Sequence, residues 1–336
     1  MNLTRLDKIN YINIALIIIS TIVALYLPFE LFLFSYAILG PLHYLTEISW
    51  LHNKQYYTKK KYDYILLLVL SALIALPVIA SLFNFKLNIS GQRLNQFIYL
   101  AVVSSIIFVF VQKTTYRILA FLFAAITLKY STHLFLLLSV FLPTLIHVFL
   151  FTALFMLYGA LKTRSKSGYL SFWIMMLFPI IVLSFFNGPA SYKISDYAFS
   201  AYKNFEATNF FTLKQFTGLD MTNGQTITNN IYFSSQGIVV MRFIAFAYTY
   251  HYLNWFSKTE IIAWHKIPKQ RLIIIALLWL MALAAYAYDY KTGFQCLFFL
   301  SFLHVLLELP LNVVSIKGIL SELFMLPTST INKKST

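Results

Sequence analysis

The sequence has a single cysteine, Cys296, among its 336 residues. One cysteine excludes an internal disulfide, and it excludes a metal site built from several thiolates. A metal ion bound by this chain must therefore be held by histidine, glutamate or aspartate.

Charged residues are also scarce. They make up 11% of the chain, whereas 60% of its residues are hydrophobic, and a soluble domain has roughly 25% charged residues. This composition predicts an all-α, polytopic integral membrane protein, with one transmembrane domain that covers residues 1–336. The formal net charge is +15, but the basic residues form short clusters between apolar runs. Such clusters are typical of topology signals and do not indicate nucleic-acid binding.

The common motifs of nucleotide and hydrolase sites are absent as well. The sequence contains no Walker loop, no Rossmann glycine motif, no Gly-x-Ser-x-Gly elbow and no His-Glu-x-x-His. Their absence argues against nucleotide-driven transport, flavin or nicotinamide binding, and the common zinc peptidases.

Apolar runs predict about ten membrane-spanning helices, because a span needs about 20 residues. The runs lie near 10–27, 29–52, 64–85, 95–112, 116–129, 133–161, 170–187, 237–256, 270–288 and 293–315. With a cytoplasmic N-terminus, the loops near 54–61, 113–117, 162–166 and 258–271 face inward. Each of these loops is richer in Lys and Arg than its outward neighbours, as the positive-inside bias requires. The C-terminus then also lies in the cytoplasm.

The longest segment between spans, at about 187–236, faces outward on this topology. It is rich in Phe, Tyr, Asn and Thr, and its aromatic residues indicate that part of it lies on the membrane surface. We expect this segment either to control substrate access or to serve only as a connector.

Four histidines lie inside predicted spans: His43, His147, His251 and His304. Each lies about 11–14 residues past the start of an even-numbered helix, which is roughly 17–21 Å of helix. All four helices run from outside to inside, so the histidines should share one layer in the inner half of the membrane. Glu47 and Glu308 follow the first and last of them by one helical turn, on the same helix face.

Ionisable side chains at this depth are costly unless they are paired or functional. A single intramembrane histidine commonly makes an interhelical hydrogen bond, but four at one depth predict a metal centre, because neutral imidazole is a common metal ligand. The two glutamates would either bind the metal or accept hydrogen bonds from the histidines. Such a ligand set suits a non-haem Fe(II) centre that activates dioxygen. Zn(II) and a dinuclear centre are the alternatives.

Aromatic residues surround the candidate ligands in the sequence. Tyr44 follows His43, and Tyr252 follows His251. These residues and their aromatic neighbours suit a cavity for a long apolar or polyene substrate, although Tyr and Trp near helix ends also anchor proteins at the membrane interface. We assign Tyr44 and Tyr252, together with Glu47 and Glu308, as candidate catalytic residues.

In these motifs the chain resembles the Brp/Blh family of bacterial membrane-integral β-carotene 15,15′-dioxygenases. The first family motif is similar to Gly40-Pro41-Leu42-His43-Tyr44-Leu45-Thr46-Glu47, with Glu in place of Asp. Ile146-His147 is similar to the second motif, and His304 followed by Glu308 is similar to the last. In the third motif only His251 matches, because Trp255 stands where a second histidine is expected. Phe151 and Thr152 stand where the family has an acid after the second motif.

The resemblance implies an iron-dependent dioxygenase of the bacterial inner (cytoplasmic) membrane that cleaves a carotenoid to retinal. The broader expectation is a membrane-embedded oxygenase that takes an apolar lipid or polyene from the bilayer, uses dioxygen and binds no nucleic acid. Two alternatives stay open. One is an ion-coupled transporter that uses the same histidines and glutamates, and the other is a zinc-dependent intramembrane hydrolase, which needs no oxygen.

Overall fold

The computed structural model describes residues 4–127, 139–185 and 192–324. All regular structure within these ranges is helical, which confirms the predicted all-α membrane bundle. The first half contains α1 (Arg5–Tyr26), α2 (Pro28–Phe34), η1 (Ser35–Leu39), α3 (Gly40–Asn53), η2 (Gln55–Tyr57), α4 (Tyr64–Leu82), α5 (Gly91–Phe110), α6 (Thr114–Thr127), η3 (Leu142–Phe151) and α8 (Thr152–Thr163). The second half contains α9 (Lys166–Phe185), α10 (Asp196–Tyr202), η4 (Lys203–Phe205), α11 (Glu206–Phe216), α12 (Gly224–Tyr232), α13 (Ser235–Ser257), α14 (Thr259–Ile262), α15 (Lys269–Tyr288) and α16 (Tyr290–Phe324).

Within the described residues, eight helical segments are long and apolar enough to cross a membrane. A ninth is added if α12 and α13, which meet at an angle of 62°, form one bent span. The expected count of ten is therefore not confirmed. The described part of α6 has 14 residues, about 21 Å of helix against an apolar bilayer core of about 30 Å. The boundary expected between 129 and 133 lies outside the described residues, and the membrane side of each terminus stays a prediction.

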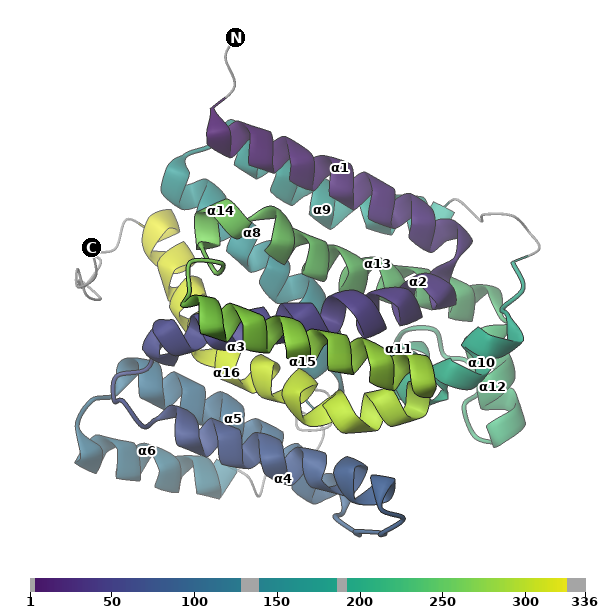
Figure 1. Cartoon of the computed structure of the whole chain (residues 1–336), viewed down its shortest axis with the longest axis horizontal. Helices are drawn as coiled ribbons and strands as arrows, with labels where there is room; N and C mark the ends of the chain where they lie inside the picture. Colours follow the sequence, from purple (N-terminus) through teal and green to yellow (C-terminus); the bar gives the residue numbers. More distant parts are fainter. Residues whose placement is uncertain (1–3, 128–138, 186–191, 325–336) are drawn as a thin grey trace.

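Two helices, α13 and α16, form the centre of the bundle. The α13 helix packs against α1, α2 and α9, whereas α16 packs against α3, α4, α5, α8 and α15. Figure 1 shows α1 and α9 along one edge of the molecule and α4, α5 and α6 along the opposite edge. Every residue of 244–252 in α13 and of 302–310 in α16 is buried. Such runs cover the whole circumference of a helix, so polar side chains within them must find partners inside the protein.

The long segment at about 187–236 is folded in its described part. Helices α10, α11 and α12 pack on one end of the bundle, where α10 contacts α2 and α11 contacts α13. Tyr202 and Tyr232 are buried there, with ring centroids 4.9 and 5.2 Å from that of Phe29. This aromatic packing holds the segment against one end of the bundle.

Prolines mark two wide turns beside the histidines. Pro41 has no N–H to continue the ordinary helical ladder, and the Gly40 N–H just before it donates to the Ser35 carbonyl, five residues back. This π-turn, η1, leads directly into the turn of α3 that carries His43. Pro143 is the second residue of the second π-helix, η3, which carries His147. Wide turns of this type recur at functional sites because they reorient the side chains that follow them.

Candidate metal centre

The four histidines meet in the core. His43 comes from α3, His147 from η3, His251 from α13 and His304 from α16, and one ring nitrogen of each lies within 4.8 Å of the others. The centroids of neighbouring rings are 4.6 Å apart for His43 and His251, 4.7 Å for His251 and His147, and 5.0 Å for His147 and His304. A fourth separation of 5.3 Å, between His304 and His43, closes the array. The expectation that these four residues converge is confirmed, and we call them the histidine cluster.

Two nitrogen–nitrogen distances test whether the cluster fits a metal ion. The Nε2 atoms of His43 and His251 are 3.0 Å apart, and those of His147 and His304 are 3.1 Å apart. Nitrogens bound to one metal at about 2.0–2.1 Å are roughly 2.9–3.4 Å from each other in octahedral or tetrahedral geometry. Both pairs fall in this range, so the cluster fits a metal ion.

Thr152 determines which nitrogen of His251 carries a proton. The Thr152 hydroxyl oxygen lies 2.9 Å from the Val148 carbonyl oxygen, to which it donates its only proton. The same oxygen lies 2.8 Å from His251 Nδ1 and must therefore accept the Nδ1–H. This leaves Nε2 of His251 unprotonated toward the cluster, which is the state that a metal ligand needs.

The two glutamates occupy different positions. An Oε2 oxygen of Glu308 contacts Nδ1 of His147 at 2.8 Å, whereas Nε2 of the same ring faces His304. Glu308 therefore lies behind a ring. An Oε2 oxygen of Glu47 lies 3.0 Å from Nε2 of His43, the nitrogen that faces the cluster. The geometry thus separates two roles that the sequence left open, with Glu47 in a ligand position and Glu308 in an outer position.

Several buried polar atoms of the site have no hydrogen-bond partner among the described residues. They are His43 Nδ1, Glu47 Oε2, His147 Nδ1, His304 Nδ1 and Glu308 Oε2. The contacts of the two carboxylates are thus short but outside hydrogen-bond geometry. An unsatisfied buried polar group costs about 1–3 kcal/mol, and a cation beside Glu47 would provide its carboxylate with a partner. A nitrogen-rich site with one carboxylate fits iron or zinc.

Both candidate tyrosines adjoin the cluster. The ring of Tyr44 lies 5.8 Å from that of His304, and the ring of Tyr252 lies 5.2 Å from that of His43. The buried Tyr44 hydroxyl has no hydrogen-bond partner among the described residues. The Tyr252 hydroxyl approaches Gly40 so closely that an added Cβ would lie 3.3 Å from it. The Tyr44 hydroxyl is therefore available beside the cluster.

Trp255 fills the position where the family motif has another histidine. Its indole ring lies 5.5 Å from the His43 ring, and its Nε1–H donates to the Thr46 hydroxyl at 3.0 Å. This hydrogen bond ties α13 to α3 next to the cluster. Trp255 is thus a packing partner of a candidate ligand.

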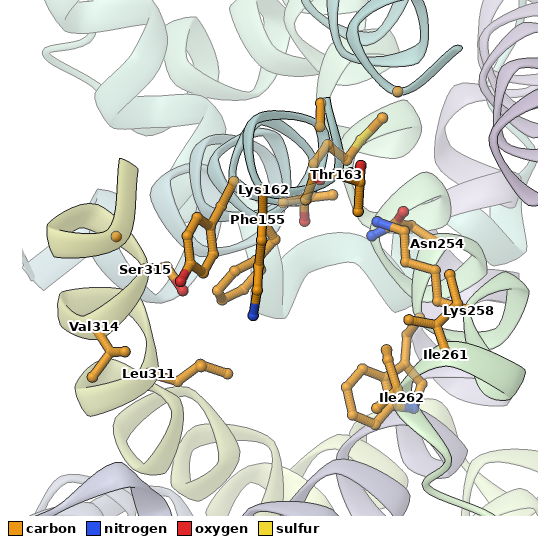
Figure 2. Close-up of a pocket in the computed structure, with 18 of the residues that line it drawn as sticks. Phe155, Lys162, Thr163, Asn254, Lys258, Ile261, Ile262, Leu311, Val314 and Ser315 are labelled. Carbon is orange, nitrogen blue, oxygen red and sulfur yellow. Dashed lines mark hydrogen bonds between the residues drawn. The ribbon is translucent and has the colours of Figure 1, made fainter. Parts of the chain in front are cut away.

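Two cavities reach the cluster from different sides. The larger has a volume of about 920 Å³, contacts His43, Glu47, His251 and Glu308, and extends between α8, α13 and α16 to the ends of these helices (Figure 2). The smaller has a volume of about 260 Å³, contacts His147 and His304, and is bordered by residues 202–208 of the segment at about 187–236. The cluster is therefore accessible from both cavities although all four histidines are buried.

No family model, curated protein or solved structure matches this chain. The class of protein to which this chain belongs therefore follows from its fold and its histidine cluster alone. The chain is a multi-pass membrane protein whose four buried histidines can hold a metal ion.

Proposed function

We propose that the protein is a membrane-embedded non-haem iron oxygenase. The observation that carries this proposal is the convergence of four histidines from four separate helical segments, with the Glu47 carboxylate beside them. Iron, when bound by these five residues, supplies the one-electron chemistry that dioxygen requires. Bare imidazoles and carboxylates have no such chemistry of their own.

The surrounding residues orient the ligands and exclude water. Thr152 holds the proton of His251 on Nδ1, at 2.8 Å, and Glu308 places its carboxyl group behind His147. Outer partners of this kind fix ring orientation and strengthen metal binding. His43 and Glu47 are 1% and 2% exposed, and an apolar substrate that fills the larger cavity would keep out water that intercepts reactive species. Tyr44 adds a hydroxyl donor at the edge of the cluster.

The substrate that we propose is an apolar lipid or a polyene that enters from the bilayer. Side chains such as Phe155, Met156, Leu311 and Val314 form apolar walls of the larger cavity, whose volume lies within the range of about 300–1,000 Å³ of ligand pockets. Oxidative cleavage of a carbon–carbon double bond transfers both oxygen atoms of one O₂ to two carbonyl products. It needs no external reductant, whereas hydroxylation or desaturation needs two further electrons. Cleavage of a carotenoid to retinal, which the Brp/Blh resemblance implies, is therefore the first reaction to test.

The test is product formation by purified protein in detergent with Fe(II) and β-carotene, under air and under argon. We expect aldehyde products under air only, and none from His147→Ala. Matched incubations with an unsaturated phospholipid distinguish a polyene from a lipid substrate. Activity that needs zinc and proceeds under argon would contradict the oxygenase proposal and support an intramembrane hydrolase.

The smaller cavity supports a second candidate, an ion-coupled transporter. Such a protein needs routes to a central site from both sides, and the two cavities contact the cluster from different sides. Without a metal, each Nε2–Nε2 pair can share one proton. Proton flux into proteoliposomes that is abolished by His43→Ala and unaffected by chelators would favour this candidate and contradict the oxygenase.

A further inference from the structure

We propose that the larger cavity binds an amphiphile with an anionic head, a carboxylate or a phosphate, which lies between Lys162 and Lys258 while its hydrocarbon chain extends toward the histidine cluster. Of the two substrates proposed above, the inference favours a lipid with an anionic head over a carotenoid, which has none. It rests on the proposed function only for the reaction of the bound molecule. Binding itself depends on the cavity and not on the metal.

Charge is separated along this cavity. Apart from histidines, the ionisable acidic and lysine side chains that line it are Glu47, Glu308, Lys162, Lys258 and Lys317. The two acids belong to the deep end, beside the histidines. Lys162 follows Thr152 by ten residues along α8, and Lys258 follows His251 by seven along α13 and its C-cap. At 1.5 Å per residue the basic end lies about 10–15 Å from the cluster.

The basic end has no acidic partner of its own. Neither Lys162 nor Lys258 takes part in an ion pair within the described part of the chain. Lys162 Nζ lies 6.0 Å from the ring centroid of Tyr158. Two acidic residues on neighbouring helix ends are already paired, Glu260 with Arg5 and Glu322 with Arg164. The ammonium groups of Lys162 and Lys258 are therefore available to an anion that enters the cavity.

Lys258 is partly withdrawn from water. Its side chain is half-buried, and burial lowers the pKa of its ammonium group to about 8. The cause is loss of hydration without a compensating negative charge. An anionic head beside this ammonium group would restore that compensation, and a charge-assisted hydrogen bond in such surroundings is stronger than one in water.

The walls between the two ends suit a hydrocarbon chain. Figure 2 shows Lys162 reaching into the cavity, with Asn254 and Lys258 on one side of it and Leu311 and Val314 on the opposite side. Asn254 is 8% exposed, and its Oδ1 has no hydrogen-bond partner among the described residues. This oxygen can only accept a hydrogen bond, so the donors for an anionic head are the lysine ammonium groups. The apolar side chains further in leave the rest of the ligand with hydrophobic surroundings.

Basic residues at helix ends also serve as topology signals, and their side chains reach toward lipid head groups. Lys266 provides the comparison, because it lies in the same basic loop as Lys258 but is exposed and does not line the cavity. If topology were the only role of these lysines, replacing Lys258 and replacing Lys266 would have equal effects on ligand binding.

The experiment is equilibrium binding of radiolabelled oleate and oleyl alcohol to the full-length protein in a neutral detergent. We expect wild type to prefer oleate, and Lys162→Met and Lys258→Met to bind oleate about tenfold more weakly, the loss of one charge-assisted hydrogen bond. Oleyl alcohol binding should not change, Lys266→Met should behave as wild type, and Lys258→Arg should retain oleate binding. The conservative Lys258→Arg variant separates loss of charge from a failure to fold.

Equal binding of oleate and oleyl alcohol by wild type would overturn the inference, and so would a Lys266→Met loss as large as that of Lys258→Met. A parallel series with oleoyl lysophosphatidate identifies the head, because the preferred anion shows whether the site takes a carboxylate or a phosphate. The assay needs neither metal nor turnover. Charge-dependent oleate binding by a protein that holds no metal would support this inference and contradict the proposed oxygenase function. Stoichiometric iron without a preference for oleate would support the oxygenase and contradict this inference.

Discussion

Thr152→Val should weaken metal binding although it removes no ligand. Valine keeps the shape of threonine but cannot accept the Nδ1–H of His251, which Thr152 accepts at 2.8 Å. The imidazole must then leave that N–H buried without a partner, at a cost of about 1–3 kcal/mol, or move the proton to Nε2, where it blocks coordination. Loss of such an outer partner typically costs about 10–100-fold in metal affinity, equivalent to roughly 1.4–2.8 kcal/mol.

The assay is competition for iron against a chelator of known affinity, followed by metal analysis of the protein fraction. Thr152→Ser is the matched control, because serine restores the hydroxyl and should bind metal nearly as well as wild type. The reasoning is refuted if Thr152→Val retains wild-type affinity, or if Thr152→Ser loses as much affinity as Thr152→Val.

Three further predictions concern other residues. Glu47→Gln should lower metal affinity more than Glu308→Gln, because the Glu47 carboxylate lies on the cluster side of His43, and equal losses in chelator competition would contradict this assignment. Lys258 should react quickly with an amine-selective reagent near pH 8, because its pKa of about 8 leaves about half of its amine neutral there, whereas an ordinary lysine, with a pKa of 10.5, is almost fully protonated. The rate of its reaction should fall as the pH drops below 8. Peptide mass spectrometry measures this rate, and a reaction at pH 8 as slow as that of an exposed lysine would contradict the prediction. Arg117→Met should lower the free energy of unfolding by about 3 kcal/mol, because it leaves the buried Asp63 carboxylate without the guanidinium that contacts it at 2.6 and 3.0 Å; detergent unfolding curves that coincide with wild type would contradict it.

The convergence of the histidines could be predicted because it depends on local features. Hydropathy places the helices, and the position of each histidine along its helix gives its depth. The distinction between Glu47 and Glu308 could not be predicted, since both lie one turn after a histidine. It depends on how α3 and α16 are rotated about their axes, and side-chain packing between helices determines that rotation.

Thr152 appeared in the sequence only as a departure from a family motif. Its position five residues after His147, inside an apolar run, was the available signal, but its partner is His251, 99 positions away. The lysines had a sequence signature as topology signals, yet only the packing of α8 against α16 and the course of α13 place Lys162 and Lys258 on one cavity. Contacts between residues so far apart are not encoded in any local pattern.

Metal content is the most direct test of the central claim. Purified wild type, His43→Ala and His304→Ala should be compared by mass spectrometry, with His52→Ala as the control because His52 is exposed and lies outside the cluster. The account predicts near-stoichiometric iron in wild type and His52→Ala, and its loss from both cluster variants. Wild-type protein that contains no metal after gentle purification, and takes up none on reconstitution, would contradict it.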